Sequence, residues 1–362
     1  MKDIHVKVAS GEYDVKVGAG LLDDIGSVAR ASVGGRQAFL VSDSHVMPLY
    51  GRRAQASLEQ AEYVVSTVTV EAGEAHKSMK SLTGLLEQMA SSGLTRDDVV
   101  VALGGGMIGD LAGFAAAVYM RGCAVIQIPT SLLAMVDSSV GGKTAVDLDA
   151  GKNLAGAFWQ PAAVVADTAC LRTVSANLLE DSCGEIIKYG VMRDPELFSS
   201  LERQPFGISD PHRVEAVVSR CIKLKRDVVA ADERESGIRE QLNLGHTIGH
   251  AIEAEKNYAW GHGSCVAAGL VCMAWADAAL GICEPETAQR IETVVAAHGL
   301  PTDTSIPINR LYGRSLSDKK RHGSEMRLVE IHAIGDVHVK QVPLESWRRI
   351  LKLGCNRSKP GK

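Results

Sequence analysis

The sequence predicts two folded parts, an α/β domain with a Rossmann-like parallel sheet followed by an all-α domain. The chain of 362 residues exceeds the usual size of one domain. Near residue 173 the pattern also changes, from strand and helix alternation to helical periodicity. We therefore expect domains at residues 1–173 and 174–355, with a disordered tail at 356–362.

Short apolar, β-branched runs mark the strands of the first domain. Each run is followed by glycine, polar or capping residues and then by a helical pattern, which is typical of a parallel sheet covered by helices. The first 17 residues also alternate charged and apolar side chains, as a strand does. The expected internal strands lie at residues 38–41, 64–70, 99–103 and 124–128.

Helical periodicity dominates the second domain. One stretch, residues 327–339, instead alternates in the manner of a hairpin, with Ile334, Gly335 and Asp336 at its turn. The expected helices lie at residues 177–191, 211–231, 242–255, 264–280 and 285–298.

The composition favours a soluble cytoplasmic enzyme. Hydrophobic residues make up 46% of the chain, charged residues 23%, and the formal net charge of −4 argues against nucleic acid or an anionic membrane as a partner. We expect no signal peptide and no membrane span, because no apolar stretch is long enough. The eight cysteines are scattered without a C-x-x-C pair, so we expect reduced, mostly buried thiols.

A glycine-rich turn, Gly104-Gly-Gly-Met-Ile-Gly109, follows the strand expected at residues 99–103. Its G-x-G-x-x-G spacing lets a backbone approach a diphosphate at a helix N-terminus. Alone the match is weak, and no acidic residue stands about 20 positions on, where one would contact the ribose. Asp43, after an earlier strand, is the candidate for that contact, and the alternative is that it caps the next helix.

Ionisable residues gather in glycine-rich surroundings near the change of pattern. Loops of this kind bring lysine ammonium groups and backbone amides against an anionic substrate. Lys225 adds a separate signal, because it takes an interior position in the apolar stripe of helix 211–231, where an anion or hydroxyl partner is expected. The gathered residues are Arg121, Asp137, Lys143, Lys152, Asn153, Glu185 and Lys188.

Three histidines lie within seventeen positions. His246 and His250 stand one helical turn apart on one face, and His262 begins the next segment, a layout that suits a metal site better than three unrelated interior histidines. Glu185 can complete the set, since two histidines with one carboxylate form a known catalytic zinc site. One of these four candidates is surplus, and their spacing does not say which.

These residues belong to a series of motifs that resembles the 3-dehydroquinate synthase family of the sugar phosphate cyclases over nearly the whole chain. Such a series in this order is highly specific. Its first segments are residues 104–113, 120–122, 129–144, 151–153 and 185–190, and its later segments are 232–233, 237–239, 243–250 and 318–320.

The resemblance implies a dehydroquinate synthase-like fold, with an NAD-binding α/β domain before a metal-binding helical domain, in a homodimer. It implies a carbon–oxygen lyase that converts 3-deoxy-D-arabino-heptulosonate 7-phosphate into 3-dehydroquinate and phosphate, on the shikimate pathway to chorismate and the aromatic amino acids. The implied steps are transient oxidation by NAD, elimination of phosphate, re-reduction and intramolecular aldol closure. Zn²⁺, or Co²⁺ in its place, would polarise the hydroxyl that is oxidised.

The resemblance assigns the metal and substrate residues one by one. It implies that Glu185, His246 and His262 bind the metal, that Arg239 holds the substrate carboxylate, and that Arg121 reaches the site of the neighbouring subunit. The implied phosphate contacts are Lys143, Asn153, Asn243, His250 and one of Lys319 and Lys320. The residues implied around the reacting hydroxyls are Asp137, Lys152, Lys188 and Lys225.

The resemblance likewise implies a set of NAD contacts, drawn from the glycine turn and from the ends of neighbouring strands. They are Asp43, Glu74, Lys77, Gly104, Gly105, Gly106, Asp110, Thr130, Ser131, Lys143, Lys152 and Thr173.

Three features depart from the family pattern: the segment 173–184, Gly184 where alanine is usual, and Ser264 where glutamate usually follows the His-Gly pair. They bear on the packing around the metal and leave its ligands intact.

Three other functions fit parts of the same pattern. One is a sibling cyclase that makes 2-deoxy-scyllo-inosose or an epi-valiolone; the others are a glycerol dehydrogenase-type alcohol dehydrogenase and a non-catalytic metal-binding protein. Asn153, Arg239, Asn243 and His250 keep the dehydroquinate synthase pattern and favour that function.

Overall fold

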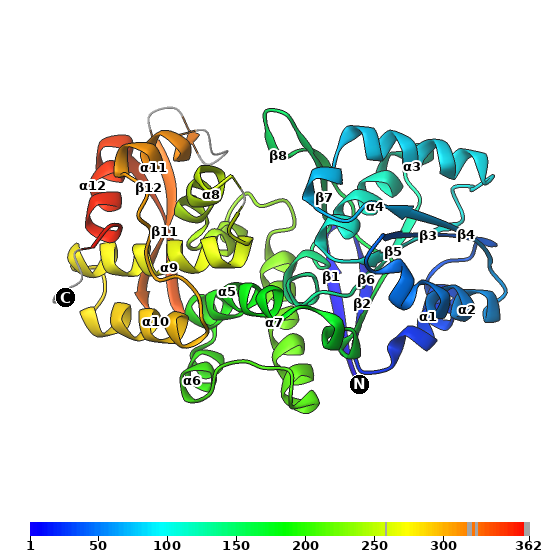
Figure 1. Cartoon of the computed structure of the whole chain (residues 1–362), viewed down its shortest axis with the longest axis horizontal. Helices are drawn as coiled ribbons and strands as arrows, with labels where there is room; N and C mark the ends of the chain where they lie inside the picture. The colour runs from blue at the N-terminus through cyan, green and yellow to red at the C-terminus, as the bar shows by residue number, and fades with distance from the viewer. Residues whose placement is uncertain (258, 317–320, 323–324, 358–362) are drawn as a thin grey trace. The chain divides into compact units, whose positions relative to one another are not determined.

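The computed structural model describes residues 1–257, 259–316, 321–322 and 325–357. The chain forms two compact units (Figure 1): unit 1 comprises Met1–Val174 and Ile208–Arg234, and unit 2 comprises Ser175–Gly207 and Glu235–Lys362. The predicted fold class is confirmed, because unit 1 is built on a mainly parallel sheet and unit 2 is helical with one small sheet.

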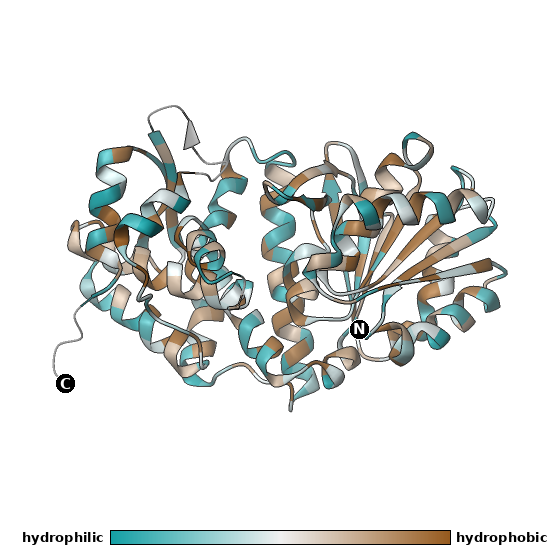
Figure 2. Cartoon of the chain, turned by 45° about the horizontal axis from the view of Figure 1, so that its top comes forward, coloured by the Kyte–Doolittle hydropathy of each residue, from teal (hydrophilic) through white to brown (hydrophobic). Residues whose placement is uncertain are grey.

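The sheet of unit 1 has seven strands in the order β1-β2-β9-β6-β5-β3-β4. β1 and β2 form an antiparallel hairpin, and every later neighbouring pair is parallel. β5 is buried along its whole length, as expected of a parallel strand covered on both faces. Figure 2 shows the strands of this sheet largely in brown, the colour of hydrophobic residues. The strands are β1 (Lys2–Val8), β2 (Gly11–Gly18), β3 (Gln37–Asp43), β4 (Val64–Val70), β5 (Val99–Gly104), β6 (Ala124–Pro129) and β9 (Ala163–Asp167).

A separate hairpin, β7 (Lys143–Leu148) and β8 (Gly151–Phe158), carries residues that we expected in open loops. Glycine and alanine in β8 give a weak strand signal, which explains why the pairing was missed. The helices and helical turns of unit 1 are η1 (Leu21–Asp24), α1 (Ile25–Ser32), η2 (Met47–Gly51), α2 (Arg52–Gln60), η3 (Glu74–His76), α3 (Met79–Ser91), α4 (Gly106–Val118), η4 (Tyr119–Arg121), η5 (Ala134–Ser138), η6 (Thr168–Thr173) and α7 (Pro211–Ala231).

The unit to which α7 belongs differs from the expected domain division. The sequence placed residues 174–355 in one helical domain, but α7 packs against β1 and β2 and therefore belongs to unit 1. Its apolar stripe, which includes Val214, Val218 and Cys221, is buried as predicted. The stripe shows that the helix is half-buried and does not show which unit buries it.

α9 (His262–Ala279) is the central helix of unit 2. It is buried along most of its length and packs against α5, α8, α10 and α12, as a helix that is apolar on all sides must. The β11 and β12 hairpin confirms the prediction for residues 327–339. The other elements are α5 (Ala176–Arg193), α6 (Pro195–Arg203), η7 (Ile238–Asn243), α8 (His246–Glu255), α10 (Pro285–Ala297), α11 (Ile308–Ser315), β10 (Arg321–His322), β11 (Glu325–Ala333), β12 (Asp336–Pro343) and α12 (Leu344–Gly354).

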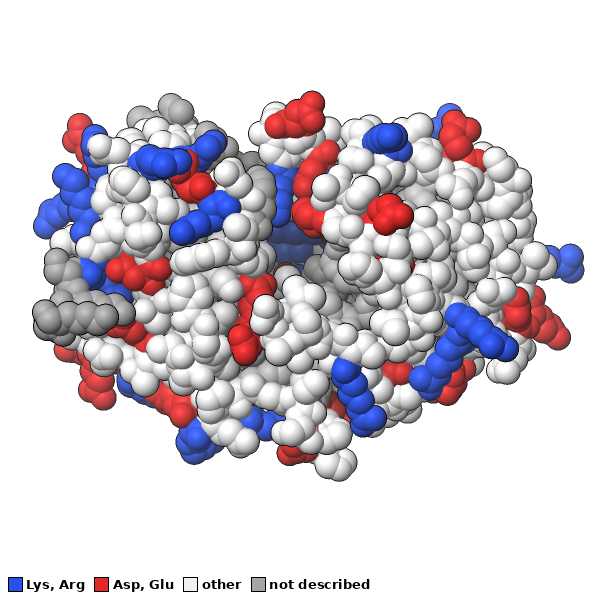
Figure 3. Space-filling model, viewed as in Figure 1, with Lys and Arg blue, Asp and Glu red and all other residues white. Residues whose placement is uncertain are grey.

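All eight cysteines lie in the described part of the chain, are buried and form no disulfide, as predicted. Two residues of the expected tail have defined contacts, because the amides of Asn356 and Arg357 donate to the Asp303 carboxylate at 3.0 and 3.1 Å. Figure 3 shows acidic and basic side chains interspersed over the face in view.

Among the described residues, no helix is both long and apolar enough to cross a bilayer.

Candidate functional site

Two helix starts bring histidines to one carboxylate in unit 2. Gly245 has a left-handed backbone with φ 76°, which ends the preceding turn and lets α8 begin at His246. His262 is the first residue of α9. Glu185 lies within α5 and is only 1% exposed.

The distances in this group fit a metal ion. Glu185 Oε1 lies 3.4 Å from Nε2 of His246 and 3.4 Å from Nε2 of His262. Bonds of about 2.0–2.2 Å to a tetrahedral zinc separate neighbouring ligand atoms by about 3.3–3.6 Å. Two imidazoles and one carboxylate also form a set that leaves a fourth position open for a substrate oxygen. The three side chains can therefore hold a catalytic zinc without rearrangement of the backbone.

The other nitrogen of each histidine has its own contact. His246 Nδ1 lies 3.0 Å from the carbonyl oxygen of Leu244, and His262 Nδ1 lies 3.4 Å from Glu253 Oε2. Such contacts fix the imidazole rings and direct Nε2 toward a metal. Glu253 was not predicted as a site residue, although it follows His250 by three positions on the same helix and so shares its face.

Charge around His262 favours a cation. Burial opposes a charged imidazole, but hydrogen bonds with Glu185 and Glu253 raise the pKa of His262 to about 10. A metal ion bound at Nε2 would satisfy the same two carboxylates in place of the proton.

Lys188 and His250 complete the cluster in unit 2. Lys188 forms an ion pair with Glu185 Oε2 and donates to the carbonyl oxygen of Leu242 at 2.9 Å, which confirms that Glu185 and Lys188 point to one side of α5. The His250 ring lies 5.3 Å from that of His246 and 5.9 Å from that of His262. His250, Glu253 and His262 thus form a second possible metal group, which shares His262 with the first.

In unit 1, the glycine turn lies where a parallel sheet commonly binds ligands, at the carboxyl ends of its strands. β5 ends at Gly104, and the Thr130 amide, just after β6, donates to the Gly104 carbonyl at 2.9 Å. A β-carbon on Gly109 would come within 2.7 Å of Gln127 Oε1, so this glycine lets α4 approach β6 closely. The predicted members Gly104, Gly105, Gly106, Thr130 and Ser131 therefore lie together.

Lys77 is the centre of a polar group beside this turn. Its side chain is 4% exposed, and its Nζ lies 2.5 Å from Asp110 Oδ2, 2.6 Å from Asn153 Oδ1 and 3.8 Å from Glu74 Oε1. Burial opposes its charge, but Asp110 and Glu74 raise the pKa of Lys77. Lys152 Nζ also lies 3.8 Å from Glu74 Oε1, so five predicted residues meet here.

Lys225 has the kind of partner that its interior position required. Its Nζ lies 2.6 Å from the carbonyl oxygen and 3.1 Å from Oδ1 of Asp137, and its side chain is 6% exposed. Asp43 Oδ1 accepts the amides of His45 and Val46, each at 2.9 Å, in the turn before η2, and it is not the N-cap residue of that element.

The remaining predicted residues are less concentrated. Arg239 is fully buried in η7, and Asn243 at the end of that turn donates to Glu235 Oε1 at 3.1 Å. Thr173 Oγ1 lies 2.7 Å from the Tyr50 hydroxyl, Arg121 ends η4, and Lys143 begins β7. Lys319 and Lys320 lie outside the described residues.

Comparison with known families gives a consistent result. The model for the 3-dehydroquinate synthase N-terminal region matches residues 67–181, and the model for the C-terminal region matches residues 182–321. In fold, the chain is an α/β unit joined to a helical unit of the dehydroquinate synthase type. The chain belongs to the 3-dehydroquinate synthase family.

Curated relatives extend over the chain. A 3-dehydroquinate synthase of Clostridium acetobutylicum is 38% identical over 355 residues, 98% of this chain and 100% of that protein. Another, of Xanthomonas campestris pv. campestris, is 44% identical over 339 residues, 90% of this chain and 91% of that protein.

Solved structures share the fold. A 2-deoxy-scyllo-inosose synthase complexed with carbaglucose-6-phosphate, NAD⁺ and Co²⁺ has a TM-score of 0.86 at 23% identity, covering 98% of this chain and 100% of its own. A 2-epi-5-epi-valiolone synthase from Streptomyces hygroscopicus subsp. jinggangensis 5008, with NAD⁺ and Zn²⁺ bound, has a TM-score of 0.84 at 24% identity, covering 94% and 96%.

Proposed function

We propose that this protein is a 3-dehydroquinate synthase, a carbon–oxygen lyase that converts 3-deoxy-D-arabino-heptulosonate 7-phosphate into 3-dehydroquinate and phosphate on the shikimate pathway. The convergence of Glu185, His246 and His262, on a chain 38% identical to a named relative along its length, carries the proposal. The protein works in the cytoplasm as a homodimer.

Glu185, His246 and His262 hold the metal. Their two Nε2 atoms converge on one oxygen of a carboxylate that is 1% exposed, whereas Glu253 contacts the outer nitrogen of His262. A bound Zn²⁺, or Co²⁺, supplies Lewis-acid polarisation of a substrate hydroxyl. Lys188 neutralises the second oxygen of Glu185 and keeps the carboxylate oriented toward the histidines.

Unit 1 holds NAD, which supplies a temporary hydride acceptor. The glycine turn allows the diphosphate to approach the N-terminus of α4, where backbone amides and the helix dipole favour negative charge. The Lys77 group positions the residues beside that turn. The assigned contacts are Asp43, Glu74, Lys77, Gly104, Gly105, Gly106, Asp110, Thr130, Ser131, Lys143, Lys152 and Thr173.

The remaining polar residues bind and orient the substrate. A flexible open-chain intermediate needs many fixed contacts before an intramolecular aldol step can close the ring correctly. Arg239 suits the carboxylate because its planar guanidinium can bind both oxygens. The residues assigned to the phosphate are Lys143, Asn153, Asn243, His250 and one of Lys319 and Lys320. The residues assigned to the reacting hydroxyls are Asp137, Lys152, Lys188 and Lys225.

Arg121 serves the site of the neighbouring subunit. Its backbone is left-handed with φ 66°, and the preceding Met120 has φ 47°. Arg96 steadies this turn by donating to the Met120 carbonyl at 2.8 Å. Left-handed backbone at residues other than glycine costs free energy and is concentrated at functional sites, which supports a role for this turn.

The test compares three sugar phosphates with purified protein: the heptulosonate phosphate, glucose 6-phosphate and sedoheptulose 7-phosphate. Each product would be identified by NMR. We expect turnover of the first, with 3-dehydroquinate as the carbocycle. Preference for either other substrate would instead assign the protein to a sibling cyclase.

A further inference from the structure

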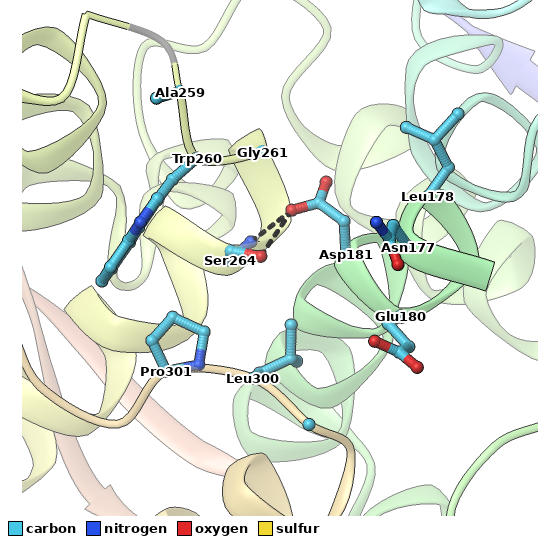
Figure 4. A pocket seen from close by; sticks show the side chains of 11 residues that line it. Asn177, Leu178, Glu180, Asp181, Ala259, Trp260, Gly261, Ser264, Leu300 and Pro301 are labelled. Atoms are coloured by element: carbon cyan, nitrogen blue, oxygen red, sulfur yellow. Dashed lines mark hydrogen bonds between the residues drawn. The ribbon is translucent and has the colours of Figure 1, made fainter. Parts of the chain in front are cut away.

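Asp181 links α5 and α9, the helices that carry Glu185 and His262 of the metal site. It lies on α5 four residues before Glu185, so both carboxylates project from the same face of the helix. Its Oδ1 accepts the amide and the hydroxyl of Ser264, each at 2.7 Å, and its Oδ2 accepts the amide of Gly263 at 3.1 Å. Figure 4 shows the side chain of Asp181 directed at Ser264.

These hydrogen bonds replace an N-cap that α9 lacks. The N-cap position is Gly261, which has no side chain, and α9 begins at His262. An N-cap side chain normally accepts amides of the second and third helical residues. Here those residues are Gly263 and Ser264, and Asp181 serves them from another helix.

Close packing leaves little freedom at this contact. A β-carbon on Gly261 would lie 2.1 Å from Asp181 Oδ1, and one on Gly263 would lie 1.8 Å from the Asp181 carbonyl oxygen. A β-carbon on Gly184 would lie 2.1 Å from the Gly263 carbonyl oxygen. The backbone on both sides of His262 is therefore held directly against α5.

We propose that Asp181 is a positioning residue of the metal centre, which sets the His262 imidazole at its distance from Glu185. The inference rests on the proposed metal ligands. α5 carries Glu185, a proposed metal ligand. One turn earlier it carries Asp181, whose carboxylate fixes the two residues after His262. The three departures from the family pattern, in segment 173–184, at Gly184 and at Ser264, all meet at this contact.

The test measures zinc affinity by competition with a chromophoric chelator, together with the absorption spectrum of the Co²⁺ form. We expect Asp181→Ala to weaken zinc binding about 10- to 100-fold and to change the cobalt spectrum, because the supporting contact of a ligand is lost. Asp181→Asn keeps an accepting oxygen and should lose less. If Asp181→Ala fails to fold, Asp181→Asn and Ser264→Ala, each expected to weaken binding, decide the question.

The matched control is Asp210→Ala. Asp210 accepts the amides of the second and third residues of α7, His212 and Arg213, at 2.9 and 3.3 Å, but it does so as the N-cap residue of that helix and lies in unit 1. We expect this variant to lose stability and keep its zinc affinity. If Asp181→Ala behaves like it, the positioning role is wrong. If the unmodified protein binds no zinc, the metal assignment itself is wrong.

A second substitution distinguishes the Asp181 contact from a general need for an acceptor at the start of α9. Ser264 is the third residue of α9, where a glutamate can reach back to the N-cap amide. Ser264 also lines a pocket with Trp260 and Pro301, which leaves room for the longer side chain. Asp181→Ala with Ser264→Glu would supply an acceptor for the Gly261 amide but none for the amides of Gly263 and Ser264, so it should bind zinc as weakly as Asp181→Ala. Recovery of zinc affinity in this double variant would contradict the positioning role of Asp181.

Discussion

At the scale of single residues, His246 and His250 show how neighbouring groups separate two similar side chains. Both lie on α8 one turn apart, and their rings are 5.3 Å from each other. His246 Nε2 lies 3.4 Å from Glu185 while its Nδ1 contacts a backbone carbonyl. The arrangement of His246 is that of a metal ligand with a supporting contact.

We therefore expect His246→Ala to lose bound zinc and His250→Ala to keep it, although both should lose activity. His246→Ala removes a ligand atom, whereas His250→Ala removes a proposed phosphate contact. Metal analysis of the two purified variants measures the difference. Equal loss of zinc would favour the group of His250, Glu253 and His262 instead.

The buried carboxyl of Asp277 should make the stability of the fold depend on pH. Burial raises the pKa of this α9 residue to about 7, although its Oδ2 accepts the Ile331 amide at 2.8 Å. The folded carboxyl thus keeps its proton to a higher pH than the unfolded one, whose pKa is about 3.9. This residue therefore lowers the stability of the fold progressively as pH rises from about 4 to about 7.

Asp277→Asn, which keeps an oxygen for the Ile331 amide, should remove that loss. We expect the variant to be more stable than the unmodified protein by on the order of 1–4 kcal/mol at pH 8, with the difference shrinking toward pH 4. Urea unfolding at several pH values measures it. A difference that does not vary with pH would contradict the assignment.

The surroundings of a single residue could be predicted from the sequence where that residue interrupts a regular pattern. Lys225 interrupts an apolar stripe, so its burial and its need for a partner followed from the periodicity of one helix. Glu253 and Asp181 were not predicted as supporting residues. Their roles depend on how α5, α8 and α9 pack, which the spacing along one helix does not contain.

At the scale of elements, the contact of α5 with α9 decides the geometry of the metal centre. Gly184 departs from the alanine expected in the family, and the structure gives a reason. A β-carbon there would meet the Gly263 carbonyl oxygen at 2.1 Å. Local pattern also predicted β11 and β12, yet it missed β7 and β8, whose glycine and alanine residues carry little strand signal.

We expect Gly184→Ala to destabilise the protein by about 1–3 kcal/mol through overpacking and to weaken zinc binding. Gly84→Ala is the control, because Gly84 lies in α3 with nothing within 4 Å of its added β-carbon. That variant should be more stable by up to about 1 kcal/mol, since alanine favours a helix. Urea unfolding compares them, and a gain in stability for Gly184→Ala would refute the close contact.

At the scale of the whole molecule, the chain assigns its chemistry to two compact units. The sequence predicted the two fold types, but it could not place α7, because a return of the chain to the first unit depends on tertiary packing. The proposed NAD contacts lie in unit 1 and the proposed metal ligands lie in unit 2.

Metal removal should therefore abolish activity reversibly. Treatment with a chelator should also lower thermal stability, because zinc binds the folded state. At a free zinc concentration 100 times its Kd, binding adds about 2.7 kcal/mol to the free energy of unfolding. Added Zn²⁺ or Co²⁺ should restore both properties. Full activity in protein shown to be free of metal would disprove the role of the centre.

We propose that the protein oxidises its substrate only transiently while it releases phosphate and closes a ring. The most direct measurement follows phosphate, 3-dehydroquinate and NADH together during turnover of 3-deoxy-D-arabino-heptulosonate 7-phosphate. We predict phosphate and 3-dehydroquinate in equal amounts over many turnovers, with no accumulation of NADH. Steady accumulation of NADH without phosphate release would contradict it and identify a dehydrogenase.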